Sequence, residues 1–162
     1  MGDSSHTWGV ATEIERKFIA DLLPTSGVGS GIAIRQGYIA EDGDAEVRVR
    51  ITDDAAKLTV KVGRGRSRTE VEVDVSADDA EQLWAHTEGR RIEKIRHAVD
   101  VDGTKADVDV YGGSLDGLIV VEVEFDSETA ADSFTPPSWF GRELTGDARW
   151  SNASLARHGR PD

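Results

Sequence analysis

The sequence contains no cysteine, and this absence excludes several classes of protein and of site. A disulfide-stabilised fold, a thiolate zinc site and a cysteine nucleophile are all ruled out. The chain also lacks any run of about 18 apolar residues, so we expect no transmembrane helix. Its first residues, MGDSSHTWGV, have neither the basic start nor the apolar stretch of a secretory signal. These features predict a cytoplasmic protein.

Positive charge is scarce as well. The chain has 19 Lys and Arg residues against 31 Asp and Glu residues, which gives a formal net charge of -12 at pH 7. General binding to nucleic acid or to an anionic membrane needs a positive field, so neither partner is expected. A local basic site for a small polyanion is compatible with this balance. The positions of the basic residues therefore matter more than their sum.

The length of 162 residues fits a single domain, and short alternating segments fill most of it. We expect a tail over residues 1–11, a candidate for disorder, and one domain over 12–162. Alternation predicts eight strands, at 12–20, 32–40, 46–52, 57–62, 68–75, 91–101, 105–111 and 118–126. Helices are predicted at 78–87, at 127–134 and after Ser151. Asp-Gly pairs favour antiparallel hairpins, and the strands alone fit either a sandwich or a closed barrel.

Six of these strands carry two like charges separated by one apolar residue. Side chains at i and i+2 of a strand lie on one face, about 6.5 to 7 Å apart. A single doublet of this kind is more often part of a solvated face than of a site. Six together indicate more, because like charges repel unless neighbouring strands or ligands compensate them. The doublets are Glu13/Glu15, Arg48/Arg50, Glu70/Glu72, Lys94/Arg96, Asp107/Asp109 and Glu122/Glu124.

Carboxylate pairs at this spacing suit hard divalent cations, and basic pairs suit phosphate oxygens. If the charged faces all point inward and the sheet closes, the product is a barrel with a polar interior. Small barrels are normally filled by aliphatic side chains, so this arrangement would be inverted. The predicted helices would cover its apolar outside. We therefore predict an α+β, mainly β fold: an eight-stranded antiparallel closed barrel with a polar interior and helices packed outside.

The order of motifs along the chain resembles one known family. The segment EIERKF at 13–18 contains E-x-E-x-K, a pattern that is weak on its own. It is followed in order by RQGY at 35–38, VRVRI at 47–51, LTVK at 58–61, EVEV at 70–73, EGRRIEKIR at 88–96, DVDVY at 107–111 and VVEVEF at 120–125. The ordered set resembles the CYTH superfamily, the triphosphate tunnel metalloenzymes. Its best match is to short bacterial members that resemble inorganic tripolyphosphatases.

The resemblance implies a tunnel that binds a linear triphosphate and hydrolyses its terminal phosphoanhydride with Mg²⁺ or Mn²⁺. It implies a clamp for the triphosphate made of Lys17, Arg48, Arg50, Lys61, Lys94 and Arg96. It also implies metal ligands at Glu13, Glu15, Glu122 and Glu124, with Glu72 and Asp109 helping to hold a second, water-activating metal. Relatives of this kind suggest a homodimer.

Some residues near these motifs have no assigned role. Arg35 would point inward if Ala33, Arg35 and Gly37 form the lining face, and Tyr38 matches a tyrosine of the short bacterial members. Glu70 and Asp107 share the charged faces.

The end of the chain departs from the family pattern D-x-R-Y, because Trp150 stands at the tyrosine position. Asp147 and Arg149 before it either close one mouth of the tunnel or form a surface pair that leads into a helix.

Two other functions stay open at this level. The same tunnel would serve a class IV-type adenylate cyclase or a nucleoside or thiamine triphosphatase, although no motif indicates a pocket for a base or a thiazole. A non-catalytic polyphosphate-binding module is the third reading. The complete set of acidic residues favours an enzyme over such a module.

Overall fold

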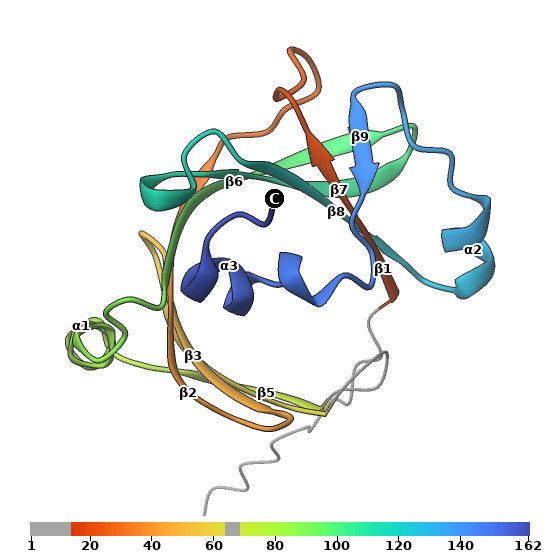
Figure 1. The fold of residues 1–162 in the computed structure, drawn as a ribbon. Helices are drawn as coiled ribbons and strands as arrows, with labels where there is room; N and C mark the ends of the chain where they lie inside the picture. Colours follow the sequence, from red (N-terminus) through yellow and green to blue (C-terminus); the bar gives the residue numbers. More distant parts are fainter. Residues whose placement is uncertain (1–13, 64–68) are drawn as a thin grey trace, which may run out of the picture.

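The computed structural model describes residues 14–63 and 69–162. Within them, nine strands form one antiparallel sheet in the order β5-β4-β3-β2-β6-β7-β8-β1-β9. The sheet curls around a central axis, which Figure 1 shows end-on. The strands are β1 (Ile14–Ala20), β2 (Ile32–Asp42), β3 (Ala45–Ile51), β4 (Ala56–Val62), β5 (Thr69–Asp74), β6 (Arg91–Val101), β7 (Thr104–Tyr111), β8 (Ile119–Phe125) and β9 (Phe140–Glu143).

The predicted barrel is confirmed only in part. The fold is α+β and mainly antiparallel, as expected, but the ladder of strands among the described residues ends at β5 on one side and at β9 on the other. Hydrogen bonds between the described strands therefore do not close the sheet. Strand β9 is also missing from the sequence prediction, and it pairs with β1 at Phe18 and Ala20. The predicted tail at 1–11 and the first two residues of the predicted first strand lie outside the described residues.

Local signals in the sequence account for several boundaries. Asp102 and Gly103 both have positive φ, 50° and 85°, which is the backbone that a tight hairpin between β6 and β7 requires. Ser76 caps α1 (Ala77–Ala85), and its side chain accepts a hydrogen bond from the Asp79 backbone N–H. The other helices are α2 (Glu128–Ser133), α3 (Asn152–His158) and the short 3₁₀ segments η1 (Gly113–Leu115) and η2 (Ala148–Trp150). No helix in the described part of the chain is long and apolar enough to cross a membrane.

The strand register places the charged doublets of the described residues on one continuous face. Side chains of directly opposed residues in an antiparallel pair point to the same side of the sheet. We call this side the inner face, because the sheet curls toward it. The pairs that establish it are Lys17 with Glu122, Glu122 with Asp107, Asp109 with Arg96, Gln36 with Ile92 and with Arg50, Arg48 with Thr59, and Thr59 with Glu72.

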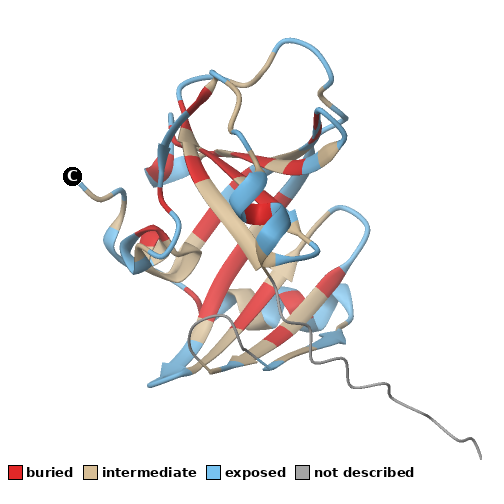
Figure 2. Ribbon diagram, turned by 90° about the vertical axis from the view of Figure 1, so that its right-hand side faces the viewer, coloured by how far each residue is buried: buried red, intermediate tan, exposed pale blue. Residues whose placement is uncertain are grey.

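Apolar side chains cover the opposite, outer face. One core cluster includes Phe18, Val108 and Val121, with Phe134 and Trp139 packed against it. A second joins Val49 and Ala80, so that α1 covers β3 and β4 from outside. Figure 1 shows α1 and α2 outside the curled sheet, and Figure 2 shows buried residues along the middle of the strands with exposed residues at the loops. Most of the sheet therefore has the predicted arrangement, with polar side chains on the inner face and apolar side chains on the outer face.

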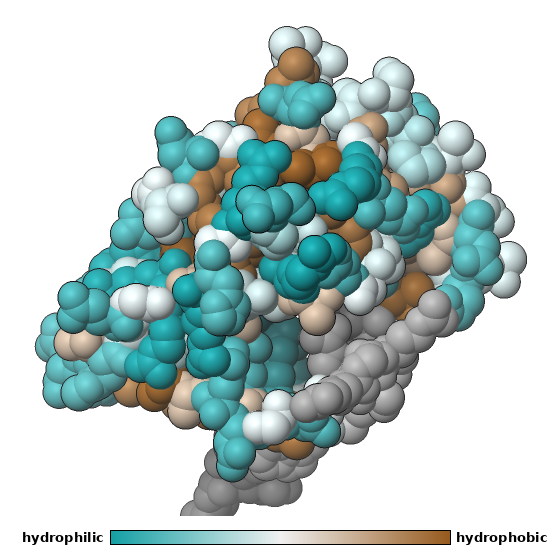
Figure 3. Space-filling view, viewed as in Figure 1, coloured by the Kyte–Doolittle hydropathy of each residue, from teal (hydrophilic) through white to brown (hydrophobic). Residues whose placement is uncertain are grey.

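One part of the inner face is apolar. Tyr38, Ile92, Tyr111 and Val120 form a buried cluster there with residues of η2 and α3, including Trp150. Helix α3 lies within the curl of the sheet in Figure 1, in contact with β6 and β2. The remaining part of the inner face carries the charges. Figure 3 shows a hollow at this place whose visible wall is hydrophilic.

Candidate active site

A fully buried ion pair lies at the middle of the inner face. The Lys94 Nζ atom is 2.6 Å from Oδ2 of Asp109, and neither side chain is exposed to solvent. Burial lowers the pKa of Lys94, and the charge of Asp109 opposes this shift. Burial would raise the pKa of Asp109, but the charges and hydrogen bonds of Lys94 and Arg96 outweigh it and lower the pKa. The pair is therefore held in its charged form by its neighbours.

Arg96 links this ion pair to two further carboxylates, those of Asp107 and Glu122. Its Nε and Nη2 atoms donate to Asp109 at 2.7 Å each, and Nη1 donates to Asp107 at 3.0 Å. Nη2 also lies 3.3 Å from Glu122. Burial opposes the charge of Arg96, but Asp109 and then Glu122 outweigh that effect and raise the pKa further. Arg96 stays a cation that is bonded to three carboxylates.

Glu122 lies between two basic side chains. Lys17 Nζ is 3.1 Å from its Oε1 atom, and Arg96 approaches its Oε2 atom. Burial would raise the pKa of Glu122, but the charges of Lys17, Lys94 and Arg96 lower it. The carboxylate is therefore ionised and faces the same space as the bases. Such a carboxylate can bind either a metal cation or a basic side chain.

The far side of the inner face, on β3 to β5, repeats this arrangement more loosely. Lys61 Nζ is 2.9 Å from Glu70, and Arg48 Nη2 is 3.6 Å from the same carboxylate. Glu72 accepts from Lys57 at 3.2 Å and from Thr59 at 3.3 Å. The Arg48 side chain is buried, and its Nε atom has no hydrogen-bond partner within the described residues. Arg48 thus has donors that an incoming anion could satisfy.

Arg50 differs from the other bases of the inner face. Its Nε atom donates to Oε1 of Gln36 at 2.9 Å, and none of residues 14–63 and 69–162 gives it an ion pair. Burial lowers its pKa, and the neighbouring cations Arg48 and Arg96 lower it further. An arginine in proteins keeps its charge despite such a shift. Among the residues that the structure describes, this cation has no carboxylate in ion-pair contact and has two cationic neighbours.

Oxygen donors for a hard metal ion line β1 and β8. Glu15 and Glu124 are directly opposed, and Glu122 follows on the same face. The described residues contain no ready group of three acidic or histidine side chains around one point. Mg²⁺ commonly uses one or two carboxylates together with substrate phosphates and water, so the donor set fits this ion without such a group. Glu13, the fourth predicted ligand, lies outside the described residues.

The structure corrects one prediction about the inner face. Arg35 points outward, where it pairs with Glu81 and lies over the Trp84 ring of α1, 5.1 Å from its centroid. The neighbouring positions Gln36 and Tyr38 face inward instead. Sequence reasoning missed Gln36 because it is uncharged and belongs to no doublet. The sequence carries no signal that singles it out, because its position opposite Arg50 follows from the register of β2 against β3.

The predicted residues near the end of the chain lie at the surface. Arg149 and Asp147 pair with each other at 2.6 Å, and the Arg149 side chain is 64% exposed. Asp147 also accepts a hydrogen bond from the backbone N–H of Arg149 at the start of η2. These contacts fit the surface pair that leads into a helix better than a group that binds in the hollow.

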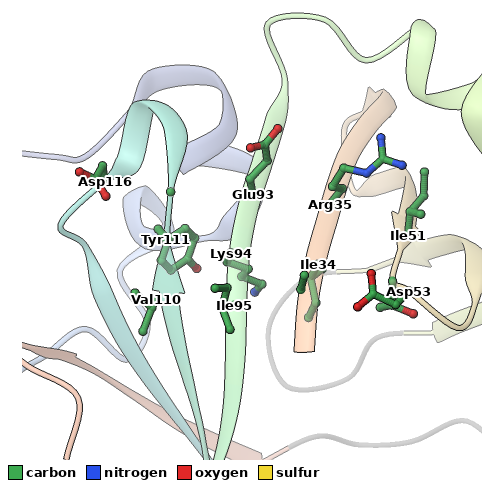
Figure 4. A pocket seen from close by; sticks show the side chains of 13 residues that line it. Ile34, Arg35, Ile51, Asp53, Glu93, Lys94, Ile95, Val110, Tyr111 and Asp116 are labelled. Atoms are coloured by element: carbon green, nitrogen blue, oxygen red, sulfur yellow. The ribbon is translucent and has the colours of Figure 1, made fainter. Parts of the chain in front are cut away.

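A pocket of about 580 Å³ lies beside β2, β6 and β7, and Figure 4 shows its lining. Ile51, Ile95 and Val110 give it apolar walls, and its acidic residues are Asp53, Glu93 and Asp116. Arg35, which also lines it, is already paired with Glu81. Lys94 lines it too, and its ammonium is paired with Asp109. Three carboxylates and two cations that already have acidic partners give this pocket little attraction for a polyanion. The charge of this lining therefore fits a triphosphate less well than the charged inner face does.

Comparison with known proteins gives consistent matches over most of the chain. The model of the CYTH domain matches residues 11–158. An inorganic triphosphatase of Nitrosomonas europaea is 44% identical over 147 residues, which cover 90% of this chain and 97% of that protein. An inorganic triphosphatase of Acetivibrio thermocellus is 38% identical over 148 residues, which cover 90% and 94%. The crystal structure of an inorganic triphosphatase matches with a TM-score of 0.75 at 40% identity, covering 91% of this chain and 95% of that one.

Proposed function

The chain belongs to the CYTH domain family, and we propose that it is an inorganic triphosphatase, which hydrolyses the terminal phosphoanhydride of tripolyphosphate. The observation that carries this proposal is the continuous charged inner face, on which Arg50 has two cationic neighbours and no carboxylate partner among the described residues. Two relatives that share 44% and 38% of their aligned residues with this chain are inorganic triphosphatases, which agrees with it.

The basic residues of the inner face would bind the substrate. Tripolyphosphate carries several negative charges near neutral pH, and these repel an incoming water molecule. Lys17, Arg48, Arg50, Lys61, Lys94 and Arg96 would hold the phosphoryl oxygens and neutralise the charge that moves onto the leaving pyrophosphate. Phosphoryl transfer depends mainly on such positioning and electrostatic stabilisation. The curl of the sheet would let these groups surround the substrate as a tunnel.

The acidic residues would hold Mg²⁺ or Mn²⁺. The predicted ligands Glu122, Glu124, Glu15 and Glu13 would supply the carboxylate oxygens that these ions prefer. When bound, such an ion would supply positive charge for the phosphate oxygens and a coordinated water of lowered pKa. Glu72 and Asp109 stay predicted ligands of a second ion. In the structure both oxygens of Asp109 accept hydrogen bonds from Lys94 and Arg96, so Asp109 would first have to give up some of these bonds.

In the structure the two sets of charges partner each other. Glu122 pairs with Lys17 and Arg96, and Glu70 pairs with Lys61 and Arg48. Binding would exchange these partners: phosphate oxygens would take the basic groups, and the metal ion would take the carboxylates. Apart from Arg50, these charges would thus be compensated both before and after binding, which limits the cost of buried unpaired ions.

Phosphate release from tripolyphosphate, ATP and thiamine triphosphate, measured in parallel with Mg²⁺ or Mn²⁺, tests this function. We expect tripolyphosphate to be hydrolysed with the highest kcat/KM and EDTA to abolish the reaction. Cyclic AMP formed from ATP would instead establish an adenylate cyclase, and a higher kcat/KM for ATP or thiamine triphosphate would establish the corresponding triphosphatase. Tight binding of tripolyphosphate without turnover would establish a binding module. Light scattering tests the predicted homodimer.

A further inference from the structure

Gln36 is a completely buried amide on the charged inner face. Its 0% exposure is unusual for a glutamine, and both ends of its side chain are bonded. Oε1 accepts from Arg50 Nε at 2.9 Å, and Nε2 donates to the Tyr38 hydroxyl at 2.6 Å. Tyr38 is itself 1% exposed and packs in the apolar cluster with Ile92. The amide is thus bonded to a buried core residue on one side and to Arg50 on the other.

The chemistry of these groups determines the orientation of the amide. Arginine has only hydrogen-bond donors, so the oxygen of Gln36 must face Arg50 and its NH₂ group must face Tyr38. The bond uses the Nε atom of Arg50, and no described residue accepts from its Nη1 or Nη2 atoms. The terminal fork of the guanidinium therefore stays available. A fork of this kind binds phosphate oxygens in a bidentate way.

The partner of Arg50 is neutral, whereas the other predicted clamp residues have acidic partners. Lys17, Arg48, Lys61, Lys94 and Arg96 each lie within 4.0 Å of at least one carboxylate. A carboxylate at position 36 would orient Arg50 equally well but would cancel its charge. A neutral amide orients the guanidinium and leaves its positive charge to attract an anion.

We infer that Gln36 is a positioning residue that holds Arg50 as an unneutralised receptor for a phosphoryl group of the triphosphate. This inference rests on the proposed function and adds to it a residue that carries no charge and does not itself contact the reacting atoms. It predicts that Gln36 acts on substrate binding only through Arg50.

A double-mutant cycle tests this coupling. Gln36→Glu, Arg50→Met and the double variant are compared with wild type for KM and kcat toward tripolyphosphate, and for metal-free binding of tripolyphosphate by calorimetry. We expect Gln36→Glu to raise KM and Kd about tenfold or more, the scale of one hydrogen bond to a charged group, with a smaller change in kcat. In the Arg50→Met background the same change should have almost no further effect. Gln82→Glu, the same substitution at an exposed position of α1, is the matched control and should leave KM unchanged.

If the two single effects on KM and Kd add in the double variant, Gln36 has only a structural role and the inference is overturned. Should Gln36→Glu fail to fold, Gln36→Met takes its place in the cycle, because it removes the acceptor while keeping the length of the side chain. Wild-type protein that neither binds nor hydrolyses tripolyphosphate would overturn the proposed function, and the role of Gln36 with it. Normal wild-type activity with additive effects would overturn the role of Gln36 alone.

Discussion

Lys94 and Asp109 form an ion pair of 2.6 Å between two side chains that have no exposed surface. Removing two charges from water costs several kcal/mol per ion, and only close geometry and further hydrogen bonds compensate it. Arg96 supplies those bonds to Asp109. The charges of the inner face are therefore built into the fold, and they are not the solvated side of an ordinary sheet.

Asp109→Asn should strongly destabilise the protein. It leaves the buried Lys94 ammonium beside a neutral amide, and breaking a buried pair from one side typically costs about 3–5 kcal/mol. The free energy of unfolding in urea measures this change. Asp54→Asn, the same substitution in an exposed loop, is the control and should cost less than about 0.5 kcal/mol. A similarly small effect at both positions would show that the pair is not buried in solution.

Acid should destabilise the unliganded protein through the same network. The pKa values of Asp109 and Glu122 are lower in the folded chain than in the unfolded one, because basic neighbours outweigh burial. The two ionised carboxylates contribute fully to the free energy of unfolding above their unfolded pKa values of about 4. This contribution is lost as the pH falls through the folded values. Urea unfolding between about pH 3 and pH 7 should show a decreasing free energy toward acid. A Glu122→Gln variant should show a shallower decrease, and an unchanged slope would contradict this assignment.

Glu122→Gln should abolish metal-dependent turnover while leaving the fold intact. The amide keeps the shape of the side chain but loses the charge that a divalent cation needs. Even residues that only support metal ligands contribute roughly 10–100-fold, so kcat should fall by more than about 100-fold. Phosphate release at saturating Mn²⁺ and tripolyphosphate measures it. Glu88→Gln, at an exposed position, is the control, and full activity in Glu122→Gln would remove this residue from the metal site.

Arg50→Met should weaken substrate binding. The variant keeps an apolar stem in the buried position but removes a cation that has no carboxylate partner in the described part of the chain. KM for tripolyphosphate should rise about tenfold or more, because a charge-assisted hydrogen bond is lost. Arg160→Met near the exposed end of the chain is the control. Equal KM values for wild type and Arg50→Met would mean that Arg50 does not contact the substrate.

The sequence predicts the charged face well because the period of a strand is two residues. Any doublet at i and i+2 must share a side, so Lys94 with Arg96 and Glu122 with Glu124 could be assigned before the structure was known. The phase of β2 could not be derived in this way. Its single arginine, Arg35, suggested an inward face, but the register of β2 against β3 places Gln36 and Tyr38 there.

The sequence could not predict which strands form the two edges of the sheet. Alternation defines strands, but the partners of the edge strands depend on contacts between distant segments. Strand β9 is four residues long and follows the Pro136-Pro137 loop. So short a strand shows too little alternation in the sequence to reveal its pairing with β1. The apolar part of the inner face was missed for the same reason, because Trp150 and Tyr38 meet only in the folded chain.

A crystal structure of the protein with tripolyphosphate and without metal, so that the substrate is not hydrolysed, tests the central claim most directly. We predict phosphoryl density on the inner face, within hydrogen-bonding distance of the Arg50 and Arg48 guanidinium groups, with the Glu122 carboxylate facing the same space. Density in the pocket beside Ile95 and Val110, or an empty inner face at saturating tripolyphosphate, would contradict it.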